Sequence, residues 1–186
     1  DTKIPQEKIK IALNANLPSD IRILDSVDVS QDFNSRFDAH DKTYMYQIYN
    51  DSVANPFYSR YSCFVPQSLN TDKMEEALKL IMGTHDFKGF MASGSQSKTT
   101  ERTVYAANLL KEGTFIKIYI NGSGFLYNMV RIISGTLIDI GKGLKDISCI
   151  ERALTDKDRS ILGHTATQEG LFLLKVNYEQ IARKNP

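Results

Sequence analysis

The segment Leu126–Ile140 constrains the fold more than any other part of the sequence, because most of its residues are apolar. Its apolar residues recur at the three- and four-residue spacing of one helix face, which predicts a helix with a wide buried side. Gly141 follows directly and suits the end of a helix. A helix this apolar must be covered by other elements, so the chain has to build a core around it.

A single arginine interrupts this segment. Arg131 falls on the arc that it shares, by helical spacing, with Tyr127, Asn128, Ser134 and Gly135. One interpretation is a solvent-facing arc that carries one arginine. The other is an arginine held against a cleft, where its planar guanidinium binds a carboxylate or a phosphate through two hydrogen bonds. The small Ser134 and Gly135 would then leave room for the partner, and the pattern alone leaves both interpretations open.

The other predicted elements alternate irregularly between helices and strands. Helices are expected over 5–17, 71–82 and 147–154, and strands over 21–29, 42–50, 103–111, 114–121 and 171–178. Glu112-Gly113 is typical of a tight hairpin turn, and residues 88–101, rich in Gly, Ser and Thr, predict a mobile loop. This pattern favours an α+β fold with helices packed on one face of a mainly antiparallel sheet.

Composition narrows the function only slightly. The net charge is +1, so a nucleic-acid partner would need a local basic patch. No run has the roughly 20 apolar residues that span a bilayer, and the first residues are charged, unlike a signal peptide. The two cysteines and three histidines are scattered, without metal-ligand or disulfide spacing. We therefore expect no membrane, no metal and a reducing cytoplasm.

Two further positions invite a chemical interpretation. Tyr44 lies on a predicted strand, where an aromatic side chain usually belongs to the core, although at a cleft it can stack on an unpaired base. With Tyr46 it would suit a non-catalytic RNA-binding module. Asp86 and His85 would suit an acid–base pair of a small-molecule enzyme. For Asp86, a loop carboxylate that caps local amides is the preferred interpretation.

Several stretches resemble, in order, the TruA family of tRNA pseudouridine synthases, and together they span nearly the whole chain. Two blocks are the most specific: RFDAHDKTYMY at 36–46 and FLYNMVRIISG at 125–135. The others are ALNANLPSDI (12–21), GTHDFKGF (83–90), ERTVY (101–105) and ATQEGLFLLKVNY (166–178).

The resemblance implies a fold and an activity. The fold would be one half of the pseudouridine synthase fold, a ferredoxin-like half-domain. Residues 1–23 would be the tail of a preceding half, and residues 24–186 would form the domain at the RNA-binding and catalytic cleft. The activity would be the isomerisation of uridine to pseudouridine in the anticodon stem-loop of tRNA, by a homodimer that uses no metal and no organic cofactor.

The matching positions also imply roles for individual residues. Tyr44 would pack on the flipped uracil, and Arg131 would pair with the catalytic aspartate. The expected RNA contacts are Arg36, Lys42, Arg102 and Asn128. The expected pocket wall consists of Phe125, Gly170 and Leu171.

The sequence departs from the family in one respect. The catalytic aspartate belongs to a Gly-Arg-Thr-Asp motif ahead of the ALNANLP stretch, whereas none of the eleven glycines here is followed by arginine. We therefore expect that this polypeptide lacks the catalytic aspartate and makes no pseudouridine by itself. A missing half would also leave a bare sheet edge and an apolar face, which favours self-association.

Overall fold

The computed structural model describes residues 3–178, which divide into two compact units. The first unit takes in the described residues up to Ala39 together with Tyr178, and the second is His40–Asn177. Each unit is considered by itself.

The first unit contains helix α1 (Gln6–Asn14), which buries none of its residues. Asn14 holds the chain that follows by two hydrogen bonds with Ile23: its Nδ2 donates to the Ile23 carbonyl (2.8 Å) and its Oδ1 accepts from the Ile23 N–H (2.8 Å). The prediction of a strand over 21–29 is wrong, because within the described part of the chain this extended segment has no strand to pair with.

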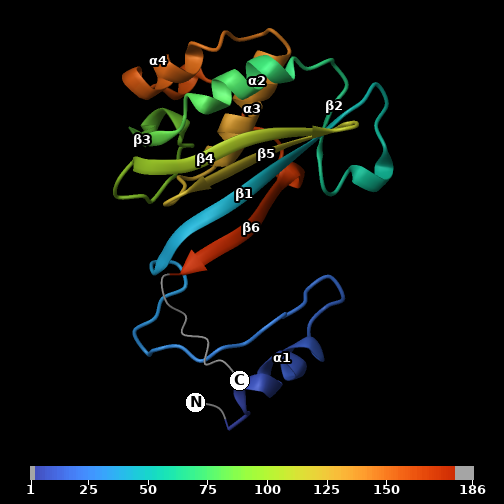
Figure 1. Ribbon diagram of the computed structural model, residues 1–186, viewed down its shortest axis with the longest axis vertical. Coiled ribbons are helices and arrows are strands. Elements are labelled where there is room, and N and C mark those ends of the chain that lie inside the picture. The colour runs from blue at the N-terminus through green and yellow to red at the C-terminus, as the bar shows by residue number, and fades with distance from the viewer. Residues whose placement is uncertain (1–2, 179–186) are drawn as a thin grey trace. The chain divides into compact units, whose positions relative to one another are not determined.

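The second unit is built on a six-stranded sheet (Figure 1). The strand order is β2-β1-β5-β4-β3, and β6 also pairs with β1. Only the β1–β2 pair is described as parallel, whereas β5 joins β1 and β4 in antiparallel register, as β3 joins β4. The strands are β1 (Ala39–Asn50), β2 (Cys63–Val65), β3 (Gly83–Asp86), β4 (Glu101–Glu112), β5 (Phe115–Gly122) and β6 (Leu171–Tyr178).

Three helices cover one face of this sheet (Figure 1). They are α2 (Thr71–Lys79), α3 (Met129–Gly141) and α4 (Cys149–Asp156). Short 3-10 helices connect the elements: η1 (Pro56–Tyr58), η2 (Phe87–Phe90), η3 (Arg159–Ile161) and η4 (Gln168–Gly170). The predicted α+β fold, with helices on one face of a mainly antiparallel sheet, is confirmed.

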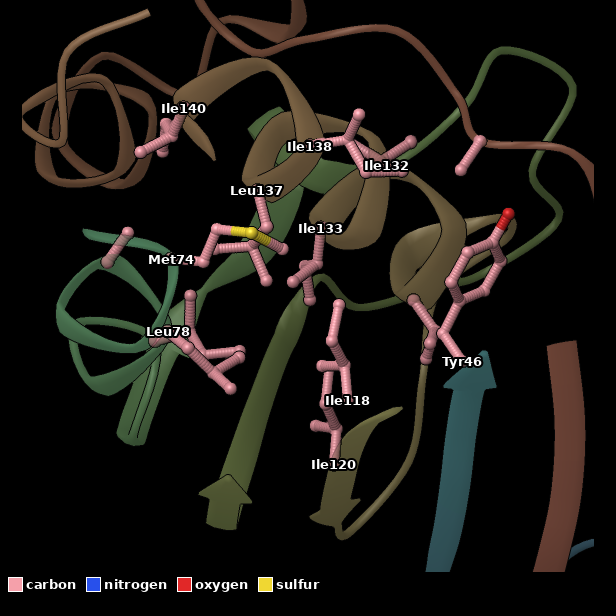
Figure 2. Close-up of a cluster of buried hydrophobic side chains, with 14 of the residues drawn as sticks. Tyr46, Met74, Leu78, Ile118, Ile120, Ile132, Ile133, Leu137, Ile138 and Ile140 are labelled. Carbon is pink, nitrogen blue, oxygen red and sulfur yellow. The ribbon is translucent and has the colours of Figure 1, made fainter. Parts of the chain in front are cut away.

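Strand alternation decides which side chains face the helices. Ile118 and Ile120 of β5 are fully buried, and they lie opposite Tyr46 and Tyr44 of β1 in the antiparallel register. Figure 2 shows how Met74 and other apolar side chains of α2 and α3 close over this row. Each such isoleucine contributes about 1.5–3 kcal/mol by leaving water, so the row under α3 fixes where that helix rests.

Helix α3 is buried on nearly all sides, and the interpretation of a solvent-facing arc is wrong. Ser134 is fully buried, and a Cβ added to Gly135 would lie only 2.0 Å from the carbonyl oxygen of His164. The Gly163 N–H donates to Thr136 Oγ1 (3.0 Å), and the Ala166 N–H donates to the Arg131 carbonyl (3.1 Å). The chain over 163–166 therefore fills the space that the small residues of α3 leave.

A buried carboxylate joins three strands at the start of β1. Asp41 accepts hydrogen bonds from Asn121 Nδ2 of β5 (2.6 Å) and from Asn177 Nδ2 of β6 (2.9 Å), and it contacts His40 Nδ1 at 3.1 Å. The His40 contact is the main cause that lowers the pKa of Asp41, and the two amides add to it against the effect of burial. Asp41 thus holds β6 at the edge of β1.

The contact of Gly135 with the 163–166 chain generates a test. We expect Gly135→Ala to lower the free energy of unfolding by about 2–3 kcal/mol, because backbone must move to admit the methyl group. This loss outweighs the roughly 1 kcal/mol by which alanine favours a helix over glycine. Urea denaturation followed by circular dichroism measures the change. At Gly124, an added Cβ meets only the Arg102 side chain at 3.4 Å or more, so Gly124→Ala is the control.

Candidate functional site

A pocket of about 120 Å³ opens where β1, β6 and the start of α3 meet. A space of this size suits one inserted group and is too small for a whole ligand of drug size. It brings together five of the residues predicted from the sequence: Tyr44, Phe125, Asn128, Arg131 and Leu171. The rest of the lining, which the sequence did not single out, is Leu126, Met129 and Val130.

Tyr44 forms one side of the pocket. It is half-buried on β1, and its ring meets that of Phe125 edge-on, with 5.1 Å between the ring centroids and 82° between the planes. Burial raises the pKa of the Tyr44 phenol, so the hydroxyl is protonated near neutral pH. A ring fixed edge-on by its neighbour keeps one flat face in a constant direction, as base stacking requires.

Arg131 reaches the same pocket from the first turn of α3. Its Nε donates to the Ala166 carbonyl (2.7 Å) and its Nη1 donates to Asn128 Oδ1 (3.1 Å). Both acceptors are neutral, so neither cancels the positive charge. The guanidinium has five N–H groups in one plane, and these two contacts hold it from two sides while others remain for a ligand.

Within the part of the chain that the structure describes, no carboxylate lines the pocket. The pKa of Glu169 is lowered chiefly by its own backbone N–H and by the Thr167 hydroxyl, and the charge of Arg131 makes a smaller contribution. The charge of Arg131 therefore acts on Glu169, but Glu169 does not line the pocket beside the guanidinium. A half-buried arginine with neutral partners is suited to receive an anion.

Lys42 and Arg102 lie near the segment that leads from β5 into the pocket. Lys42 is opposite Gly122 in the β1–β5 register, and the Arg102 side chain packs on Gly124. Arg102 also holds the preceding loop, because its Nη2 donates to Ser97 Oγ (2.9 Å) and its Nη1 to the Glu101 carbonyl (2.5 Å). Burial lowers the pKa of Arg102.

Two other predicted site residues do not line this pocket. Gly170 lies against β1, where a Cβ would be 2.7 Å from the Gln47 carbonyl oxygen and 2.7 Å from the Tyr46 ring. Arg36 belongs to the first unit, is exposed, and has its guanidinium 5.7 Å from the centre of the Phe37 ring. Their predicted roles, like those of the pocket residues, stay predictions.

The alternative sites fare differently. Tyr46 is fully buried and donates its hydroxyl to the Thr167 carbonyl (2.7 Å), so its ring cannot stack on RNA. His85 Nε2 contacts the Met82 carbonyl (2.8 Å), whereas Asp86 pairs with Lys157 Nζ (2.7 Å). The acid–base pair is therefore not assembled.

Asp86 instead holds its own neighbourhood together. It accepts from the backbone N–H of Lys88 (3.1 Å) at the start of η2. The Lys157 ammonium is the first cause that lowers the pKa of Asp86 from 3.8 to about 2, followed by Thr100 and the Lys88 N–H. The interpretation of Asp86 as a capping carboxylate is confirmed.

Within residues 3–178, no cluster of three or more His, Cys, Asp or Glu side chains is placed to hold a metal ion. None of the helices within that range combines the length and the apolar character that a membrane crossing requires.

The sequence is similar to those of known enzymes. Residues 77–179 match the family described as tRNA pseudouridine synthase. The chain is 46% identical over 175 residues to tRNA pseudouridine synthase A 2 of Clostridium tetani, covering 94% of this chain and 71% of that protein. It is 42% identical to tRNA pseudouridine synthase A of Caldicellulosiruptor bescii (95% and 72% covered) and 37% identical to that of Staphylococcus aureus (97% and 67%).

The chain belongs to the tRNA pseudouridine synthase A family.

The Asp86–Lys157 pair generates a second test. The pKa of Asp86 is about 2 in the folded chain and 3.8 ordinarily, so its stabilising effect is complete above about pH 4 and is lost as the pH falls towards 2. We expect Asp86→Asn to cost roughly 1 kcal/mol of unfolding free energy at pH 7, a value discounted because Lys157 is half exposed. Urea denaturation should show a clearly smaller difference at pH 2.5 than at pH 7, because the effect is lost only as the pH falls through the folded pKa. An equal cost at the two pH values contradicts the role of the charge, and the exposed Asp28→Asn is the control.

Proposed function

We propose that this chain contributes Tyr44 and Arg131 to the isomerisation of uridine in the anticodon stem-loop of tRNA. The observation that carries this proposal is the pocket that these two side chains share. Its arginine is held only by neutral acceptors there, and no carboxylate lines it in the described part of the chain. These residues would be the partners of a catalytic aspartate that another segment supplies.

The reaction would need residues from two polypeptide segments: an aspartate from another segment, and Arg131 and Tyr44 from this chain. An aspartate attacks the target nucleotide, and the bond from ribose C1′ to uracil N1 breaks. Uracil then turns and rejoins C1′ through C5, and the aspartate is released as a carboxylate. The proton leaves C5 and N1 gains one, so atoms balance without any co-reactant. Arg131 would keep the attacking carboxylate ionised and oriented through a two-bond pairing.

Tyr44 would act on the base. Extruding uridine from its stack costs a few kcal/mol, and stacking on an aromatic ring returns about 1–3 kcal/mol. Phe125 holds the Tyr44 ring at a fixed angle, and Leu171 closes the pocket beside it. Gly170 would serve this wall indirectly, because its lack of a side chain lets the β6 end approach β1.

RNA binding would come from local charge, since the net charge is only +1. Lys42 and Arg102 would bind phosphates beside the segment that enters the pocket. Asn128 would contact RNA at the pocket edge, and Arg36 would do so from the first unit.

The isolated chain would be inactive and prone to associate. We infer that residues 1–23 are the tail of a half that supplies the aspartate and that 24–186 form the domain described above. Helix α1 buries none of its residues, while Ile11 and Leu24 are 65% and 86% exposed. Such apolar side chains favour a partner surface, in keeping with a homodimer in the cytoplasm.

The proposal is tested by separating binding from turnover. The purified chain should bind a tRNA anticodon stem-loop with an affinity that falls steeply with salt, and it should form no pseudouridine in that RNA. Lys42→Met should reduce the slope of log affinity against log salt by about one if Lys42 binds one phosphate. Filter binding and nucleoside analysis of the RNA are the measurements. Turnover by this chain contradicts the missing-aspartate proposal, and a flat salt response contradicts the RNA site.

Tyr44 gives a sharper test of the pocket. We expect Tyr44→Leu to weaken binding of the stem-loop about tenfold, because leucine fills the space but cannot stack on a base. Tyr61→Leu is the matched control, since Tyr61 is 60% exposed and lies near β2, away from the pocket lining. Equal effects of the two substitutions, with unchanged melting temperatures, would remove Tyr44 from the site.

A further inference from the structure

Asn128 has an unusual backbone for the residue that begins a helix. It is the N-cap of α3 with φ 59° and ψ 10°, in the left-handed region, and its side chain caps no backbone N–H of the helix. An asparagine at this position ordinarily accepts from the N–H two or three residues on. The left-handed region is sparsely used by residues other than glycine, although Asn and Asp tolerate it best. The Asn128 side chain is therefore not used to cap the helix, and it contacts another group.

The carboxamide oxygen of Asn128 accepts a hydrogen bond from Arg131, the arginine of the proposed site. Oδ1 of Asn128 accepts from Arg131 Nη1 at 3.1 Å, and the Ala166 carbonyl accepts from Arg131 Nε at 2.7 Å. Two acceptors on different edges of a planar group fix both its position and its rotation. The Ala166 N–H also donates to the Arg131 carbonyl (3.1 Å), so the second acceptor is itself fastened to α3.

We propose that Asn128 is a positioning residue that sets the guanidinium of Arg131 for a carboxylate while adding no charge of its own. This inference rests on the proposed function, in which Arg131 pairs with a carboxylate. A neutral acceptor is required, because an aspartate at the same place would form an ion pair with Arg131 and compete with the incoming carboxylate.

The role is compatible with RNA binding by the same side chain. A carboxamide has an acceptor oxygen and a donor NH₂ group at opposite corners, so Asn128 can hold Arg131 with one and meet RNA with the other. The proposal concerns the oxygen alone.

Two substitutions separate positioning from a purely structural role. Asn128→Asp keeps the shape, the acceptor oxygen and the tolerance of a left-handed backbone, and replaces the donor NH₂ group with a charged carboxylate oxygen. Asn128→Gly keeps the backbone conformation and removes the acceptor. If Asn128 only shaped the chain, both variants would behave like the parent protein. Alanine is a poorer choice, because its Cβ would add backbone strain.

The probe is acetate, titrated into the isotope-labelled 186-residue chain. The side-chain N–H signals of Arg131 are followed by NMR, together with the melting temperature of each variant. We expect a saturable shift of these signals in the parent chain, about tenfold weaker binding in Asn128→Gly, and no saturable shift in Asn128→Asp, because the introduced carboxylate already occupies the guanidinium. Asn108→Asp, on the exposed part of β4, controls for the added negative charge.

The outcomes divide cleanly. If acetate leaves the Arg131 signals of the parent chain unmoved, the proposed function of Arg131 fails, and the positioning role fails with it. If the parent chain binds acetate and both variants bind it equally well, the proposed function stands and the role of Asn128 is overturned. Should Asn128→Asp fail to fold, the Asn128→Gly titration decides alone: affinity equal to that of the parent chain refutes the role.

Discussion

The attachment of the 163–166 chain to α3 is the constraint on which the rest of the site depends. The His164 carbonyl approaches Gly135 more closely than any side chain would allow, and the Gly163 N–H donates to Thr136 Oγ1. At the other end of this segment, the Ala166 N–H donates to the Arg131 carbonyl, and Arg131 Nε donates to the Ala166 carbonyl. The contact that packs the helix is therefore the same contact that aims its arginine. The same stretch of backbone therefore stabilises α3 and orients the Arg131 side chain.

This arrangement explains how an arginine can belong to a helix that is otherwise core. The buried row of β5 fixes α3 on the sheet, and the first turn of the helix then projects past the row towards Tyr44. There the guanidinium is surrounded by neutral dipoles, which lower the cost of burying its charge without cancelling it. A charge kept in that condition is a receptor for an opposite charge.

Much of the fold followed from the sequence, and the failures have physical causes. The helix-face spacing of 126–140 and the alternation in 42–50 predicted α3 and β1, since both depend on which side chains a core must bury. The strand expected over 21–29 failed, because apolar alternation cannot show whether a partner strand exists. The three-residue β2 is too short to leave a pattern, and β3 carries Gly and polar residues.

The site was predictable only in part. The sequence singled out Tyr44 and Arg131, and the resemblance predicted Phe125, Gly170 and Leu171 as the pocket wall. The pocket contains Phe125 and Leu171, and it also contains Asn128, which was expected only as an RNA contact. The second support of Arg131 was missed, because it is a backbone carbonyl, and every residue has one; the sequence around Ala166 gives no sign of it. The solvent-facing interpretation of the arginine arc failed for a related reason, since small residues in a helix fit an open groove and a tightly packed one equally well.

The buried carboxylate at the start of β1 has a consequence for the pocket on the far side of that strand. Asp41 holds β6 through Asn177, and β6 begins with the leucine that closes the pocket. A protonated Asp41 would carry a hydroxyl that donates a hydrogen bond, so it could accept fewer hydrogen bonds from the amides. The attachment of β6 to β1 would then weaken. The position of the strand that closes the pocket therefore depends in part on an ionised carboxylate outside the pocket lining, so acidification would weaken the attachment of that strand.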